Sequence, residues 1–101
     1  MSSHNWTFEE DLYCCKKYLK FYFSNDTNKS LVSLIKNLSL KLSKISEGSI
    51  RMKINNIRFL MHKYGLIKES NSLLNQYSAQ CQAAFYQAIK DLNEEYERQS
   101  S

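Results

Sequence analysis

The sequence predicts an all-α fold, and two observations carry this prediction. The 101 residues include no proline and two glycines, so the chain lacks the turn residues that a many-stranded sandwich or barrel needs. Apolar residues instead recur three and four positions apart in several segments, which is the period of an amphipathic helix. With 43% hydrophobic residues the chain can build a core, although its length excludes a large multi-domain enzyme. We therefore expect a small helical protein.

The first helix is predicted to begin after Thr7. A Thr followed three residues later by Glu10 forms a capping box, in which each side chain accepts a hydrogen bond from the other residue's backbone N–H. The apolar stripe of this helix comprises Phe8, Leu12, Cys15, Leu19, Tyr22 and Phe23. Trp6, just before the helix, is predicted to anchor the core. Residues 24–28 are rich in turn formers and predict the following loop.

Two further helices are predicted on either side of a short break at residues 43–48. The second helix carries the stripe Leu31, Leu34, Ile35, Leu38 and Leu42. Ser46 is the predicted N-cap of the third helix. The buried face of that helix, spanning about 80° on a helical wheel, comprises Ile50, Ile54, Ile57, Met61 and Tyr64. Gly65 is a natural stop, because glycine adopts the left-handed conformation that closes a helix.

A long last helix is predicted to follow an irregular segment at residues 66–72 and to end near Arg98. Its apolar stripe comprises Tyr77, Cys81, Ala84, Phe85, Ala88, Ile89, Leu92 and Tyr96. This stripe either packs onto the chain itself or forms the seam of a homodimer, and the sequence does not separate the two. We thus divide the chain into a three-helix domain at 1–65 and a connecting loop with a C-terminal helix at 66–101.

Neither a catalytic centre nor a cofactor or metal site is predicted. Cys14, Cys15 and Cys81 are odd in number and form no Cys-x-x-Cys pair, which favours reduced thiols in the core. His4 and His62 have no partners nearby in sequence, and nucleotide-binding and nucleophile motifs are absent. No apolar run approaches the roughly 18 residues of a membrane span, and a signal-peptide pattern is missing. We therefore expect a non-enzymatic cytoplasmic protein, associated with the nucleoid if it binds DNA.

The net charge of +4 is concentrated in the middle of the chain. Residues 27–68 hold nine basic residues against Glu47 alone, a net charge of +8, whereas residues 1–26 carry −1 and residues 69–101 carry −3. A cluster of one sign raises the local potential and attracts a polyanion. The segment from helix two to helix three also has the length and pattern of a helix-turn-helix. Double-stranded DNA is the predicted partner.

The third helix offers side chains suited to reading bases. Arginine pairs bidentately with the guanine edge, asparagine pairs with the adenine edge, and a methionine can touch a thymine methyl group. The predicted base contacts are Arg51, Met52, Asn55 and Arg58. The predicted phosphate contacts are Lys36, Lys41, Lys44, Ser49, Lys53 and Lys63.

Two stretches of the chain resemble a known family. Trp6-Thr7-Phe8-Glu9-Glu10-Asp11 resembles the W-T-x-E-E-D opening of Myb/SANT-type DNA-binding repeats, and residues 46–56 are similar to the start of their recognition helix. The resemblance covers about residues 5–62. It implies a three-helix domain with Trp6, Ile50 and Ile54 in the core, and places Arg51, Met52 and Asn55 where the family contacts bases. Residues 48–55 also resemble segments that precede nuclease domains in bacterial restriction-type proteins.

Three alternatives remain open. Met52 and Phe59 lie near the centre of the outward face of helix three, and the last helix is expected to cover Phe59. It covers either only the C-terminal end of helix three, which leaves the groove-reading residues open, or the whole face, which excludes groove reading. Tyr13, Tyr18 and Tyr22 are either packing residues, which helical spacing favours, or a stacking platform for single strands. The leading hypothesis is a small bacterial or phage-type protein that reads the major groove with helix three. The other is a protein-interaction module, such as a phage-encoded inhibitor of a host restriction or CRISPR enzyme.

Overall fold

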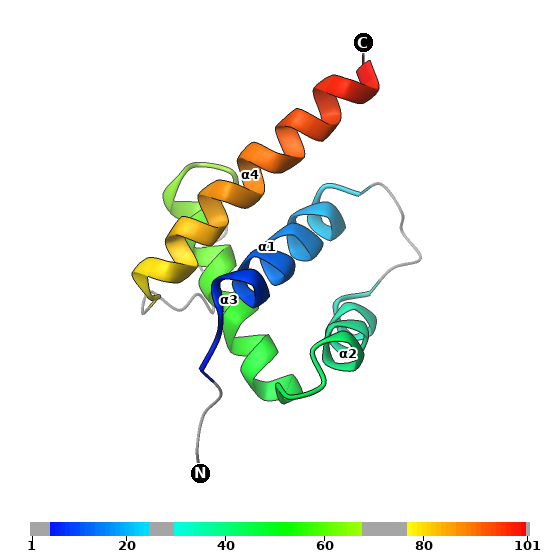
Figure 1. Ribbon diagram of the computed structural model, residues 1–101, viewed down its shortest axis with the longest axis vertical. Coiled ribbons are helices and arrows are strands. Elements are labelled where there is room, and N and C mark those ends of the chain that lie inside the picture. Colours follow the sequence, from blue (N-terminus) through cyan, green and yellow to red (C-terminus); the bar gives the residue numbers. More distant parts are fainter. Residues whose placement is uncertain (1–4, 25–29, 68–76, 101) are drawn as a thin grey trace.

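The protein is all-helical in the parts of the chain that the computed structural model describes, residues 5–24, 30–67 and 77–100. Within these ranges it has four helices and no strand: α1 (Phe8–Tyr22), α2 (Leu31–Lys41), α3 (Glu47–Lys63) and α4 (Ala79–Ser100) (Figure 1). The predicted fold class is thereby confirmed. His4, most of the predicted loop at 24–28 and most of the irregular segment at 66–72 lie outside the described residues.

The helix ends follow from local hydrogen bonds. The Glu10 N–H donates to Thr7 Oγ1 at 3.1 Å and the Thr7 N–H donates to Glu10 Oε1 at 2.9 Å, which confirms the predicted capping box. Ser46 caps α3 as predicted, since its Oγ accepts the Ser49 N–H at 3.2 Å. Gly65 takes a φ of 77°, the left-handed conformation that the prediction required after α3. These local interactions set the start of α1 and both ends of α3.

The core lies where α1, α3 and α4 meet, and α2 closes it from the side. Helix α4 packs most extensively against α1, and the two helices run side by side in the same direction (Figure 1). The largest fully buried side chains include Ile35 and Leu38 of α2, Ile50, Ile54, Ile57, Leu60 and Met61 of α3, and Phe85 of α4. The last helix therefore packs onto its own chain, one of the two arrangements that the sequence left open.

The buried face of α1 differs from the predicted stripe. Its buried residues are Asp11, Cys14, Cys15, Tyr18 and Leu19. The two ends of the predicted stripe are exposed, with 36% of Phe8 and 57% of Phe23 in contact with solvent. The physical reason is that α4 and α3 pack against α1 from different directions, so the covered face is broader and rotated. Tyr18 is thus a packing residue.

The predicted core anchors have different degrees of burial. Ile50 and Ile54 are buried at the centre of the core, whereas Trp6 is half-buried and packs against its edge. Tyr64, predicted to continue the buried face of α3, is 38% exposed because it is the C-cap residue, where the chain leaves the helix. The three cysteines are free and buried, as the sequence predicted.

Candidate nucleic-acid interface

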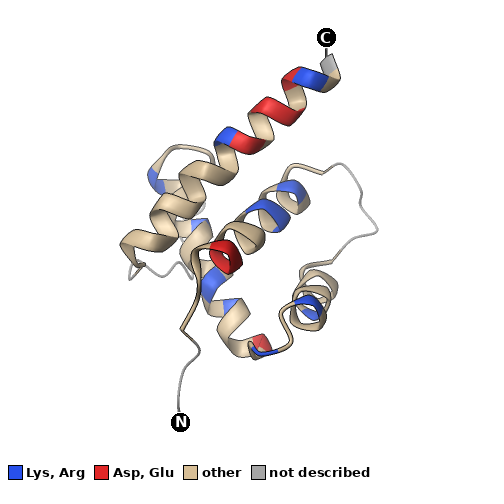
Figure 2. Ribbon diagram, viewed as in Figure 1, with Lys and Arg blue, Asp and Glu red and all other residues tan. Residues whose placement is uncertain are grey.

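Four exposed cations lie along α2, the connection after it and the first turns of α3. They are Lys36, Lys41, Lys44 and Arg51. Figure 2 shows blue residues on these elements, with Glu47 as the acidic residue at the start of α3. None of the four pairs with an acid among the described residues. Their charge is therefore uncompensated and available to an anionic partner.

Two of the three lysines of α1 differ, because acids of α4 pair with them. Lys16 Nζ lies 2.8 Å from Asp91 Oδ2, and Lys20 Nζ lies 3.6 Å from Glu95 Oε2. The hydrogen bond from Lys16 lowers the pKa of the Asp91 carboxyl. The third lysine, Lys17, is exposed and has no carboxylate partner among the described residues, so α1 keeps one uncompensated cation beside those of α2 and α3.

The outward face of α3 is open over its first half. Arg51 is exposed and 60% of Met52 contacts solvent, while Asn55 and Arg58 are half-buried. Further along the helix, the ring of Phe59 packs against Tyr77 with the ring centroids 5.6 Å apart. Phe59 is half-buried, and the ring that packs on it belongs to Tyr77, just before α4, rather than to the last helix itself. This contact lies on the second half of α3, and the predicted base-reading residues Arg51 and Met52 stay exposed.

Lys53 was predicted to contact a phosphate, and this prediction is wrong because its side chain is buried. Only 8% of the residue is exposed, its Nζ lies 2.8 Å from Asp11 Oδ1, and its ammonium stands over the Trp6 ring at 4.7 Å from the centroid. Asp11 is fully buried, and Gln80 Nε2 donates to its Oδ2 at 2.9 Å and to the Trp6 carbonyl at 2.7 Å. Position 53 faces α1 rather than solvent, so Lys53 joins α3 to α1 and does not reach a phosphate.

The structure separates Lys63 from the other predicted phosphate contacts. It lies in the last turn of α3, and its Nζ donates to the Tyr77 hydroxyl at 2.8 Å, which raises the pKa of the lysine. Beside it, the Tyr64 hydroxyl accepts hydrogen bonds from Gln82 at 2.6 Å and from Tyr86, and the latter lowers the pKa of Tyr64. Since α3 is about 25 Å long at 1.5 Å per residue, Lys63 stands at the end remote from Arg51.

Ser49 serves the helix cap. Its side chain is half-buried, and its Oγ accepts a hydrogen bond from the Ser46 hydroxyl at 3.1 Å. The Ser49 hydroxyl therefore already takes part in the N-terminal cap of α3. Lys36, Lys41, Lys44, Arg51 and Met52 are thus exposed, and Ser49 and Asn55 are half-buried, on α2, the connection after it and the first half of α3.

No protein-family model, curated protein or solved structure matches the chain. Among the described helices, none is long and apolar enough to cross a membrane. The same part of the chain holds no group of three His, Cys, Asp or Glu residues able to bind a metal ion.

The cysteines lie together in the core and have the properties of buried thiols. Burial raises the pKa of the Cys14 thiol to about 12. The Cys15 thiol donates a hydrogen bond to Cys81, which raises the pKa of Cys15 and lowers that of Cys81. Because a thiolate rather than a thiol is the nucleophile, Cys14 and Cys15 remain unreactive near neutral pH.

Proposed function

We propose that this protein binds double-stranded DNA without catalysing a reaction, and that the first half of α3 enters the major groove. The observation that carries the proposal is the set of four exposed cations on α2, the connection after it and the first turns of α3, none of which pairs with an acid in the described part of the chain. In a three-helix arrangement of the Myb type, such a face meets the groove while the preceding helix contacts the backbone.

Each side chain has a role set by its chemistry. Arg51 pairs with a guanine edge, Asn55 with an adenine edge, and Met52 touches a thymine methyl group. Lys36, Lys41 and Lys44 neutralise phosphates and so hold the protein in register. Arg58 stands at the margin of this contact, since it is half-buried next to the covered half of α3.

Selection from a random duplex pool, followed by fluorescence anisotropy at several salt concentrations, tests the proposal. We expect Arg51→Ala and Asn55→Ala to weaken binding to the selected site by about 1–3 kcal/mol each, and Lys41→Ala to weaken all sequences alike. Lys90→Ala removes an exposed cation of α4 and serves as the matched control, with affinity unchanged. Absence of duplex binding at about 50 mM salt, where phosphate contacts are strong, would overturn the proposal.

A second candidate function rests on the end of α4. Glu94, Tyr96 and Glu97 are exposed there, and 72% of Tyr96 contacts solvent. Figure 2 shows this end of α4, which carries both red and blue residues, pointing away from α2 and the start of α3. A row of carboxylates can mimic phosphate charge and bind the basic surface of a nucleic-acid-processing enzyme. Under this alternative, a Glu94→Lys and Glu97→Lys double variant loses the protein partner in a pull-down, while any duplex binding persists.

A further inference from the structure

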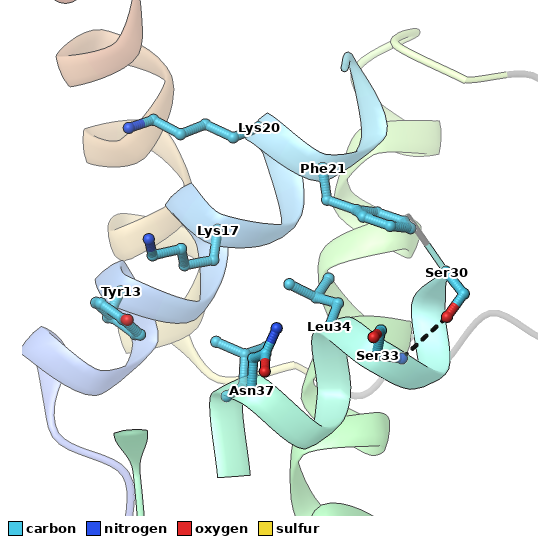
Figure 3. A pocket seen from close by; sticks show the side chains of 9 residues that line it. Tyr13, Lys17, Lys20, Phe21, Ser30, Ser33, Leu34 and Asn37 are labelled. Carbon is cyan, nitrogen blue, oxygen red and sulfur yellow. Dashed lines mark hydrogen bonds between the residues drawn. The ribbon is translucent and has the colours of Figure 1, made fainter. Parts of the chain in front are cut away.

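A cleft opens between α1 and α2, apart from every residue assigned to the DNA-binding face. Its volume is about 370 Å³, within the range of roughly 300–1,000 Å³ that is common for small-molecule sites. Figure 3 shows side chains from the two helices facing each other across it. The residues that line the cleft are Tyr13, Lys17, Lys20, Phe21, Ser30, Ser33, Leu34, Asn37 and Leu38.

The walls and the mouth of the cleft differ in chemistry. Phe21, Leu34 and Leu38 supply an apolar wall, and Tyr13 adds a second aromatic ring. Lys17, Ser33 and Asn37 are exposed and form part of the mouth. Such a combination suits a ligand with an apolar body and one polar end.

The charge of the mouth selects an anion. None of the described residues that line the cleft is acidic. Lys17 is exposed and has no carboxylate partner among the described residues, and its ammonium lies 5.5 Å from the centroid of the Tyr13 ring. Lys20 extends toward α4 in Figure 3, where it pairs with Glu95 at 3.6 Å. Lys17, which has no carboxylate partner in the described part of the chain, is therefore the main cation at the mouth. An exposed ion pair such as Lys20–Glu95 is worth only about 0–1 kcal/mol, so Lys20 can turn to a ligand at little cost.

We propose that this cleft binds a small aromatic carboxylate. The aromatic body packs between Tyr13, Phe21 and Leu34, and the carboxylate meets the Lys17 ammonium, with the Asn37 amide as a neighbouring hydrogen-bond donor. A volume of about 370 Å³ is within the range of small-molecule sites, so the proposed occupant is a free small molecule.

The test is a titration of the full chain with 2-naphthoate and, separately, with the neutral isostere 2-naphthamide, followed by amide NMR. We expect shift changes at residues 13–21 and 30–38, and a Kd for the acid about three- to fivefold lower than that for the amide. Lys17→Met keeps the aliphatic stem and removes the charge, so it should bring the two Kd values together. Lys36→Met is the matched control, because it removes an exposed cation of α2 that does not line the cleft. The Kd of this variant for 2-naphthoate should equal that of the unaltered protein.

Ser33→Trp provides an independent variant, because Ser33 is exposed and a large ring at this position fills the mouth. It should abolish the shift changes while leaving the helical circular dichroism intact. Equal affinity for the acid and the amide, shift changes elsewhere on the molecule, or binding undiminished in Ser33→Trp would each overturn the proposal. So would the absence of any shift at millimolar naphthoate. Duplex binding plays no part in this measurement, so its outcome is independent of the DNA-binding proposal.

Discussion

At the residue scale, the Asp11–Lys53 pair joins three helices through one buried carboxylate. Asp11 of α1 is fully buried and meets Lys53 of α3 and Gln80 of α4. Breaking a buried pair by removing one partner costs about 3–5 kcal/mol, because the remaining charge is left without compensation. We expect Lys53→Met to lower the free energy of unfolding by that amount in urea denaturation.

The double variant Asp11→Asn with Lys53→Met separates the pair from the packing around it. We expect it to lose less stability than the sum of the two single variants, since it leaves neither charge unpaired. If the double variant lost as much stability as the two single variants together, Asp11 and Lys53 would not be energetically coupled, and the expectation would be wrong.

The buried thiol of Cys14 makes the free energy of unfolding fall as the pH rises into the alkaline range. Burial raises its pKa to about 12 from the ordinary value of 9.0, so the unfolded chain loses this proton first. The corresponding stability is fully present below pH 9.0 and is lost as the pH rises toward 12. Between pH 8 and pH 10, the unaltered protein should lose about 1.4 kcal/mol more than Cys14→Ala, as measured by urea denaturation at both pH values. Equal losses in the two proteins would contradict this assignment.

At the element scale, the two glycines have opposite roles. Gly48 lies in the first turn of α3, and a Cβ added there meets only Ser46 Oγ, at 3.9 Å. Gly65 has a φ of 77°, where a side chain is strained even though nothing lies within 4 Å of it. Gly48→Ala should therefore stabilise the protein by about 0.4–1 kcal/mol, and Gly65→Ala should destabilise it by about 1–2 kcal/mol. Thermal unfolding of the two variants checks this difference, which would fail if both midpoints shifted in the same direction.

The helix ends could be predicted because their signals are local. Thr7 with Glu10, Ser46 with Ser49, and Gly65 each act on backbone groups within a few residues, so a short stretch of sequence contains the whole interaction. The buried faces could not be predicted equally well. Which side of α1 is covered depends on where α3 and α4 arrive, and this places Cys14 and Tyr18 inside while Phe23 stays exposed.

At the scale of the whole molecule, α4 completes the core that α1 and α3 begin. Phe85, Ala84 and Ala88 are fully buried in the same cluster as Cys14 and Cys15 of α1. A fragment that ends at residue 67 would expose these surfaces, so we expect it to lack a cooperative urea transition. Within the full chain, Phe85→Ala should lower the free energy of unfolding by about 3–5 kcal/mol. If the fragment unfolded with the midpoint of the full chain, α4 would be an accessory element.

Part of the candidate site could also be predicted, because the charge of a segment is a local property of the sequence. An excess of basic residues in one stretch of sequence locates positive charge without reference to the fold, and Lys36, Lys41, Lys44 and Arg51 are indeed exposed. Whether each cation remains free depends on its neighbours in space. Lys53 meets Asp11 and Lys63 meets Tyr77, and both partners are far away in sequence.

The amino-acid sequence alone specifies the all-α fold class, the residues that cap α1 and α3, and the segment that carries the positive charge. These properties arise from hydrogen bonds and composition within short stretches. Tertiary packing decides that α4 lies along α1, that Lys53 turns inward, and that a cleft opens between α1 and α2. Each of these three features depends on contacts between residues that are far apart in the sequence and meet only in the folded chain. Helical periodicity describes one helix at a time and therefore does not predict them.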